Sequence, residues 1–259
     1  MVRGCLLLLA IGSAGFAQAQ STPVRPPYVG HAVLTHRNGK LIIHVNNSRP
    51  VEQALAGLRR EYGLTLDYEE GEADDPARVT GLVKDRRWIG GSYTIKVNEP
   101  ASSSFADSKK FIADVLSQFR DHSPQRFIEI IGANDRITVS PSNPSERILD
   151  TPITLKSKDR TIDQTIKAIL AAVSQKVYKP FGQGGIADTG TLIGHVTIGS
   201  ATPIAARILL AQALDSLPYR RYWIQGWDPR EDTYAILIDG VVRTEKTMSG
   251  AVREIPIRK

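Results

Sequence analysis

The most distinctive chemistry in the sequence is an arginine- and aromatic-rich stretch near the C-terminus. Residues 219–227 are Tyr-Arg-Arg-Tyr-Trp-Ile-Gln-Gly-Trp. Side chains alternate between the two faces of a strand, so Arg221, Trp223 and Trp227 would share one face. If the opposite face, which carries Tyr222, covers the core, those three side chains are exposed. Exposed arginine and tryptophan together are typical of protein interfaces and of carbohydrate platforms. The alternative is that Trp223 belongs to the core and the arginines are its solvated neighbours.

A shorter patch of the same kind occurs in the first half of the chain, at Arg86, Arg87 and Trp88. We predict that the two patches supply the partner-binding residues. These residues are Arg221, Trp223, Trp227, Arg86, Arg87 and Trp88.

Histidines and carboxylates form no catalytic or metal-binding pattern. The histidines are His31, His36, His44, His122 and His195, with no H-x-x-x-H or H-E-x-x-H spacing. The carboxylates of residues 69–75 follow one another without the spacing of a calcium loop, which predicts a solvated acidic loop. No G-x-S-x-G element marks a serine nucleophile. We therefore expect no catalytic residue, no bound metal and no cofactor, and an enzyme of unrecognised type is a less favoured third class.

A glycine-rich segment, Gly182-Gln183-Gly184-Gly185, has the composition of a phosphate-binding loop but not its context. A P-loop continues with G-K-[ST], and a dinucleotide fingerprint lies between a strand and a helix. Here residues 186–194 lead into another strand. We predict a long loop over residues 181–192 that is a candidate for a mobile contact.

The N-terminus has the features of a secretory signal. Arg3 precedes an apolar run over residues 5–11, and Ala17-Gln18-Ala19 fits a small-x-small cleavage pattern. We predict removal of residues 1–19 and a periplasmic or secreted protein with no transmembrane segment. Cys5, the single cysteine, would leave with the signal, so disulfides and thiol chemistry are not expected. The net charge of +6 is spread along the chain, which favours a basic soluble surface over a nucleic-acid site.

The remaining residues divide into segments by composition. We expect a flexible leader over residues 20–30, a first module over 31–140, a proline- and serine-rich linker over 141–150, a second module over 151–240 and a polar tail over 241–259. The strands are expected at residues 31–37, 40–45, 64–68, 92–97, 127–131, 136–139, 153–156, 176–180, 195–198, 220–227 and 233–238. The helices are expected at residues 50–62, 105–119, 161–174 and 202–217.

The order of these elements repeats, and so do some residues. Arg49-Pro50-Val51-Glu52-Gln53-Ala54-Leu55 is similar to Arg160-Thr161-Ile162-Asp163-Gln164-Thr165-Ile166. A weaker match joins Ala113-Asp114-Val115-Leu116 to Ala211-Gln212-Ala213-Leu214. We therefore predict an internal duplication. The expected fold class is α+β, with two tandem β-α-β-β-α-β modules, each a small mixed or antiparallel sheet packed on two helices.

The first module resembles the secretin and TonB short N-terminal domain and related secretin N-domains. The residues that carry the resemblance are Ile42 to Val45, Pro50, Val51, Ala54-Leu55, Leu58, Tyr62, Gly63-Leu64, Leu66 and Tyr68. Residues 153–169 resemble the pattern less completely, because the Gly-Leu element is missing. The resemblance implies small exported modules that contact proteins or sense ligands in the cell envelope, without catalysis.

Our leading hypothesis is an exported, non-catalytic adaptor that binds an envelope protein through an exposed sheet edge or the aromatic–arginine patch. The alternative is a binder of cell-wall glycan or another small ligand, with a concave site lined by Trp223 or Trp227. A nucleic-acid partner is not expected for an exported chain. The sequence leaves the partner's identity and the oligomeric state open.

Overall fold

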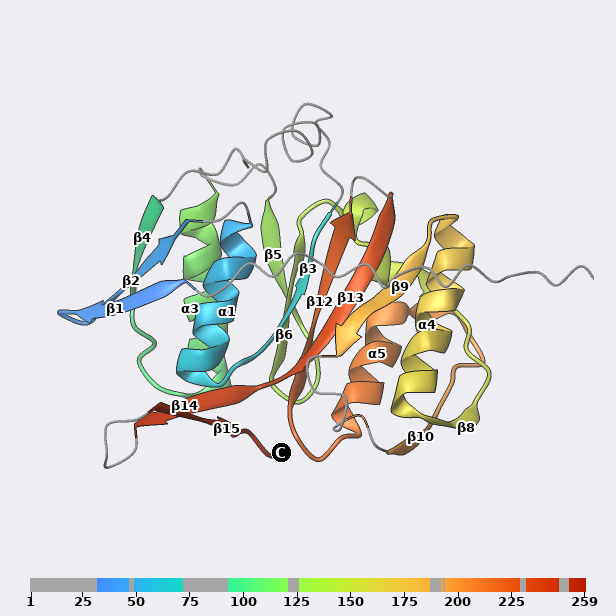
Figure 1. Cartoon of the computed structure of the whole chain (residues 1–259). Coiled ribbons are helices and arrows are strands. Elements are labelled where there is room, and N and C mark those ends of the chain that lie inside the picture. Colours follow the sequence, from blue (N-terminus) through green and yellow to red (C-terminus); the bar gives the residue numbers. More distant parts are fainter. Residues whose placement is uncertain are drawn as a thin grey trace, which may run out of the picture.

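The computed structural model describes residues 32–46, 49–71, 93–120, 126–186, 192, 194–228, 232–246 and 252–259. Within them the chain is α+β, as predicted, with helices packed on sheets (Figure 1). The predicted signal segment, the leader, and the patch of Arg86, Arg87 and Trp88 lie outside the described residues. None of the described helices combines the length and the hydropathy that a bilayer-spanning helix requires.

The first half of the molecule comprises β1 to β6. Its elements are β1 Val33–Arg37, β2 Lys40–Val45, α1 Pro50–Tyr62, β3 Thr65–Glu69, β4 Tyr93–Asn98, α3 Phe105–Phe119, β5 Phe127–Ile131 and β6 Arg136–Pro141. Two 3-10 turns, η1 Pro144–Glu146 and η2 Ile148–Asp150, follow.

The second half runs from β7 to β13, and a hairpin follows it. Its elements are β7 Pro152–Ile153, β8 Lys158–Thr161, α4 Ile162–Val177, β9 Phe181–Ile186, β10 His195–Ile198, β11 Ile204–Ala205, α5 Ala206–Asp215, β12 Arg221–Asp228 and β13 Thr233–Gly240. The closing hairpin is β14 Val242–Lys246 and β15 Val252–Pro256.

Local signals fix several of these boundaries. Asn38 and Gly39 both have positive φ, 53° and 70°, and form the tight turn between β1 and β2. Gly63 ends α1 in the left-handed conformation, with φ 62°. Thr161 and Gln164 form a capping box at the start of α4, in which each side chain accepts the other residue's backbone N–H at 3.2 Å.

One six-stranded sheet runs through both halves, in the order β5-β6-β3-β12-β13-β9. β3 of the first half and β12 of the second half are parallel neighbours at its centre, where Tyr68 lies opposite Ile224. The segment between the halves is packed against them, because Leu149 in η2 is fully buried. The two halves therefore share one continuous sheet.

Each half has its own hydrophobic core. In the first, α1 and α3 lie between the six-stranded sheet and a three-stranded sheet of order β1-β2-β4. In the second, α4 and α5 pack on β9, β13 and β12, and Trp223 is 1% exposed among them. Ile224, the next residue along β12, belongs to the first core. Because adjacent strand residues point to opposite faces, the two helix pairs cover opposite faces of the six-stranded sheet.

The two halves have the same strand connectivity. β6 lies between antiparallel β5 and parallel β3, and β13 lies between antiparallel β12 and parallel β9. An antiparallel pair, β2 with β4 or β8 with β10, completes each half. By this order β12 corresponds to β5, β9 to β3, and α5 to α3.

Several segments differ from the sequence expectation. Residues 181–186 form β9 rather than part of a loop, because backbone pairing with β13 compensates for the low strand propensity of glycine. Residues 176 and 177 belong to α4 and not to a strand. α5 begins at Ala206, after the short β11, and β7 ends at Ile153. Residues 241–259 include the β14–β15 hairpin, and β14 packs against α1.

Candidate functional site

The two halves meet where β3 of the first half pairs with β12 of the second half, and we call this contact the joint. β3 lies between β6 and β12, and every one of its residues is buried. Beyond the strand end, the N–H of Glu70 donates to the carbonyl of Gln225 at 3.1 Å. α5 lies over the same place, because two of its side chains reach the first half. β3 therefore occupies the edge of β12 beside α5, and we call this occupied position the groove between β12 and α5.

Asp67 anchors β3 in that groove. Arg136 of β6 donates to both oxygens of the Asp67 carboxylate, at 2.7 and 2.9 Å. The backbone N–H of Trp223 donates to the same carboxylate at 3.1 Å. Arg136 also donates to Asp215 of α5 at 2.7 Å and to the carbonyl of Arg221 at 3.0 Å. Burial raises the pKa of Asp67 and Arg136 opposes that shift, so the charged pair is held by its hydrogen bonds.

Glu69 forms a second anchor on the same face of β3. Arg207 of α5 donates to its carboxylate at 2.8 Å, and Ser140 does so at the same distance. The N–H of Leu149 in η2 donates to its other oxygen at 2.8 Å. Because these donors come from α5, β6 and η2, Glu69 ties the helix, the sheet and the connecting segment together.

Glu70 continues the network at the end of the strand. Its carboxylate accepts from Arg49 at 2.6 Å and from the N–H of Trp227 at 3.0 Å. Glu69 and Glu70 are thus buried and paired, and the expectation of a solvated acidic loop is wrong for both. They are buried because β3 extends to Glu69 and β12 covers its edge. Residues 72–75 of the expected loop lie outside the described residues.

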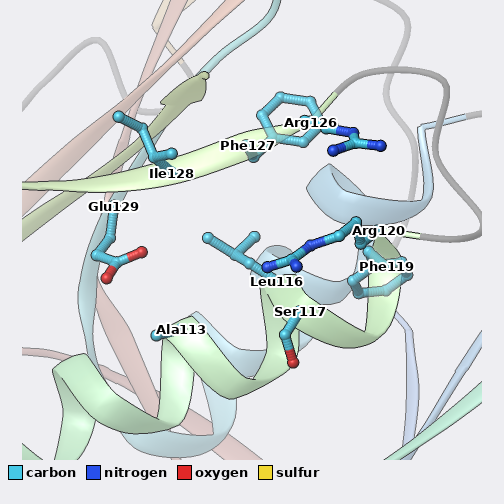
Figure 2. A pocket seen from close by; sticks show the side chains of 9 residues that line it. All are labelled: Ala113, Leu116, Ser117, Phe119, Arg120, Arg126, Phe127, Ile128 and Glu129. Carbon is cyan, nitrogen blue, oxygen red and sulfur yellow. The ribbon is translucent and has the colours of Figure 1, made fainter.

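A corresponding groove exists at the outer end of the same sheet. β5 is the terminal strand, and among the described residues no strand pairs with its outer edge. A cavity of about 240 Å³ lies between β5 and α3 (Figure 2). It is lined by Ala113, Leu116, Ser117, Phe119, Arg120, Arg126, Phe127, Ile128 and Glu129. Since α3 and β5 correspond to α5 and β12, this groove is the counterpart of the one that β3 fills.

The groove has an apolar floor and charged ends. Figure 2 shows Leu116 pointing from α3 toward β5, with Glu129 at one end of the groove and Arg126 at the other. Arg120 and Arg126 are exposed, and neither forms an ion pair with a residue that the structure describes. β5 is half-buried or exposed along its length, whereas β12 is buried from Trp223 to Gly226. The difference reflects β3, which pairs with the edge of β12, and the first core, which covers Ile224 on the other face of β12.

The backbone of β5 offers hydrogen-bonding groups at this edge. The carbonyl of Arg126 accepts from Ser142, and the N–H of Gly132 donates to Arg136, so both face β6. Backbone direction alternates along a strand, which places the N–H and C=O groups of Phe127, Glu129 and Ile131 on the outer edge. The strand carries neither proline nor lysine, which commonly protect an edge from pairing.

The aromatic–arginine patch does not form the exposed surface expected from the sequence. Arg221 is 5% and Trp223 1% exposed, and Trp227 is half-buried. Both faces of β12 are covered because the strand is interior to the sheet and a helix pair packs on each side. The groove of Figure 2 contains no tryptophan, so it is not the Trp-lined concave site of the glycan hypothesis.

The three described histidines each lie beside polar side chains of other elements. His36 lies 3.1 Å from both Glu61 and Glu99, His44 lies 3.0 Å from Thr94, and His195 lies 3.3 Å from Asp159. The hydrogen bond to Glu99 raises the pKa of His36. Among the described residues, no three His, Cys, Asp or Glu side chains gather in a metal-binding arrangement.

Sequence reasoning missed the charged joint and the groove. A usable signal was present at Asp67, an acidic residue between Leu66 and Tyr68 in an alternating strand. Such a position has to be either solvated or paired. The groove itself had no signal, because α3 and β5 have ordinary apolar patterns.

Comparison of the chain with protein-family models, with curated proteins and with solved structures finds no match.

Proposed function

We propose that this chain is an exported, non-catalytic binding protein of the cell envelope that takes an extended segment of a partner protein into the groove between β5 and α3. The proposal includes two duplicated modules similar to secretin N-domains. The repeated strand connectivity supports the duplication, and the small-x-small pattern at residues 17–19 supports export. The partner segment would extend the six-stranded sheet by one strand.

One observation carries the proposal. The corresponding groove, between β12 and α5, already holds a parallel strand within the same molecule. The two edges belong to halves of the same connectivity, so the fold accommodates a strand at this position. The edge of β5 meets the physical requirement for such an addition, because Phe127, Glu129 and Ile131 direct backbone groups outward.

The test separates backbone pairing from side-chain contact. Glu129→Pro removes an outward N–H and leaves the bonds from β5 to β6 in place, since proline is tolerated at sheet edges. Glu129→Ala keeps that N–H and removes the same side chain. We expect residues 20–259 to capture a partner by cross-linking in the envelope fraction. Glu129→Ala should retain that partner and Glu129→Pro should lose it.

Two further measurements make the result decisive. Circular dichroism and thermal unfolding must show that both variants are folded. Hydrogen exchange at Glu129 and Ile131 should slow when the captured partner is added, because their amides become hydrogen-bonded. Capture that is equal in both variants, with unchanged exchange in β5, would place the binding surface elsewhere and refute the proposal.

A further inference from the structure

The two ends of the six-stranded sheet carry different strands, and these two strands are complementary. β5 ends the sheet on one side and β9 on the other. β9 corresponds to β3, because each runs parallel to the middle strand of its half, β13 or β6. β3 is the strand that fills the groove of β12 and α5. Among the described residues, the molecule thus carries an open groove at β5 and, at the opposite end of the sheet, an unpaired counterpart of the strand that fills such a groove.

The strand directions fix how the halves are related. β6, β3 and β12 run in one direction, and β13 and β9 run in the other. The left-to-right order of corresponding strands is the same in both halves, while their direction and their helix-bearing face are reversed. This relation is a half-turn about an axis across the sheet, combined with a shift of one half.

Repeating that step restores the orientation of the first half. β5 is antiparallel to β6 and therefore runs in the same direction as β9. Suppose that the first half of a second molecule is placed by the same step from the second half of the first molecule. The β5 strand of the second molecule then lies parallel to β9 of the first, just as β12 lies parallel to β3 within one molecule. The two strands can therefore pair in parallel without turning either molecule around.

We infer that β9 of one copy pairs in parallel with β5 of a second copy, in the groove between β5 and α3. This inference rests on the proposed function, because it names a second copy of the chain as the partner of that groove. The contact is head to tail: each copy uses a different surface at each end, so pairing does not close on itself and produces open chains.

The composition of β9 suits this role. Its residues are Phe-Gly-Gln-Gly-Gly-Ile, with no charge and no proline to block a neighbouring strand. The carbonyl of Pro180 accepts from Tyr234 of β13 at 2.9 Å, so Phe181 and Gln183 direct their N–H groups to the outer edge. Directly after Gln183 the register of β9 on β13 shifts by one residue, so the regular edge is the part from Phe181 to Gln183. Gly182 is exposed, and a side chain added there would meet nothing within 4 Å, so this face of β9 is uncovered by the described residues.

The end of α4, which precedes β9 in the chain, is exposed, whereas the corresponding end of α1 is covered. Tyr178 ends α4 in the left-handed conformation and is 93% exposed. The corresponding residue of the first half, Gly63 at the end of α1, lies against Ile257 of the C-terminal segment. A large exposed aromatic side chain is typical of an interface residue.

The intermolecular contact would lack the buried charges of the internal joint. β3 supplies Asp67 and Glu69, whereas β9 carries no acidic residue. We therefore expect association that is reversible and depends on concentration, in contrast to the permanent joint inside the chain.

The experiment is sedimentation velocity of residues 20–259 over a concentration series. The average mass of the wild type should rise continuously past that of a dimer. Glu129→Pro blocks the β5 edge and Gln183→Pro blocks the β9 edge, and each variant alone should stay monomeric. An equimolar mixture of the two should form dimers and nothing larger, because one intact β9 and one intact β5 remain. Glu129→Ala and Gln183→Ala are the matched controls and should assemble like the wild type.

Three results would overturn the inference. These are a monomeric wild type at all concentrations, association that Gln183→Pro leaves unchanged, and a mixture of the two proline variants that stays monomeric although both are folded by circular dichroism. The proposed function fails separately. If the wild type is monomeric but Glu129→Pro alone loses an envelope partner, the groove binds another protein and the second-copy inference is refuted.

Discussion

Arg136 illustrates how single buried charges connect the two halves. It is 2% exposed and bonds to Asp67 of β3, to Asp215 of α5 and to the backbone of β12. A buried ion of this kind is stabilised only by its partners, so removing one partner costs far more than the pair contributes. The stability of the joint therefore depends on a few residues and can be tested one residue at a time.

We predict that Arg136→Met destabilises the chain by about 3–5 kcal/mol, because it leaves Asp67 buried and unpaired. The double variant Arg136→Met/Asp67→Leu should recover part of that loss. Urea unfolding gives both values. Lys167→Ala is the control, since it breaks an exposed pair with Asp163 and should cost about 0.5 kcal/mol or less. Equal losses in the two single variants would contradict the expectation.

Glu52 gives a prediction about pH. Burial raises its pKa to about 7, with Arg49 opposing and Glu70 adding to the shift. In the unfolded chain the pKa is about 4.3. The folded state therefore holds a proton that the unfolded state has released, and the contribution of Glu52 to stability falls as pH rises from about 4.5 to 7.

Glu52→Gln should flatten this part of the stability profile. Urea unfolding at a series of pH values measures the slope, and the variant should lose less stability than the wild type between pH about 4.5 and 7. An unchanged slope would show that Glu52 is ionised throughout that range.

At the scale of elements, equivalent parts have different surroundings. β5 and β12 occupy corresponding positions, yet within the described part of the chain a strand pairs with the outer edge of β12 and none with that of β5. The ends of α1 and α4 differ in the same way, since Ile257 covers Gly63 and Tyr178 is exposed. An element's role here follows from what lies beside it as well as from its own residues.

Two glycines test the contact between α1 and the C-terminal segment. Gly63→Ala introduces a side chain at φ 62° and meets Ile257, whereas Gly39→Ala introduces one at φ 70° with no neighbour within 4 Å. We expect about 1–2 kcal/mol of left-handed strain in both and an additional loss only in Gly63→Ala. Thermal unfolding measures both losses, and identical values would show that the segment adapts at no cost.

At the scale of the whole molecule, the shared sheet makes the two cores interdependent. β3 packs its apolar face in the first core and directs Asp67 and Glu69 to groups that include those of the second half. Unfolding the second half would take the Trp223 N–H from Asp67 and the Arg207 guanidinium from Glu69.

We therefore predict a single cooperative thermal transition for residues 20–259. The calorimetric and van't Hoff enthalpies should agree, and tryptophan fluorescence and far-UV circular dichroism should change together. In Arg136→Met/Arg207→Met, which removes both arginines from the joint, the transition should broaden or separate. Two resolved transitions in the wild type would show that the halves fold independently.

The described helices and turns were largely predictable. Pro50 and Gly63 mark the two ends of α1, and Asn38-Gly39 marks a turn; each signal acts within a few residues through φ preference or capping. The α+β class followed from the order of such elements. Segments without a local signal were misassigned, notably residues 181–186, which form a strand only through pairing with β13.

The candidate site could not be predicted in the same way. The sequence correctly predicted that Trp223 and Ile224 point to opposite faces of a strand. It could not show that both faces of β12 are covered. That depends on β3, whose Asp67 lies 156 positions before Trp223. The exposed sheet edge named in the leading hypothesis could likewise not be assigned to β5 from its own residues.

The sequence by itself determined the secondary structure of most described segments and the α+β class, because caps, turns and periodic apolar residues act locally. Only the tertiary structure decided which charges are buried, which face of β12 is covered and which sheet edges stay open. Those properties arise from pairing between strands distant in the chain, where the free energy of burying an edge depends on the neighbour that covers it.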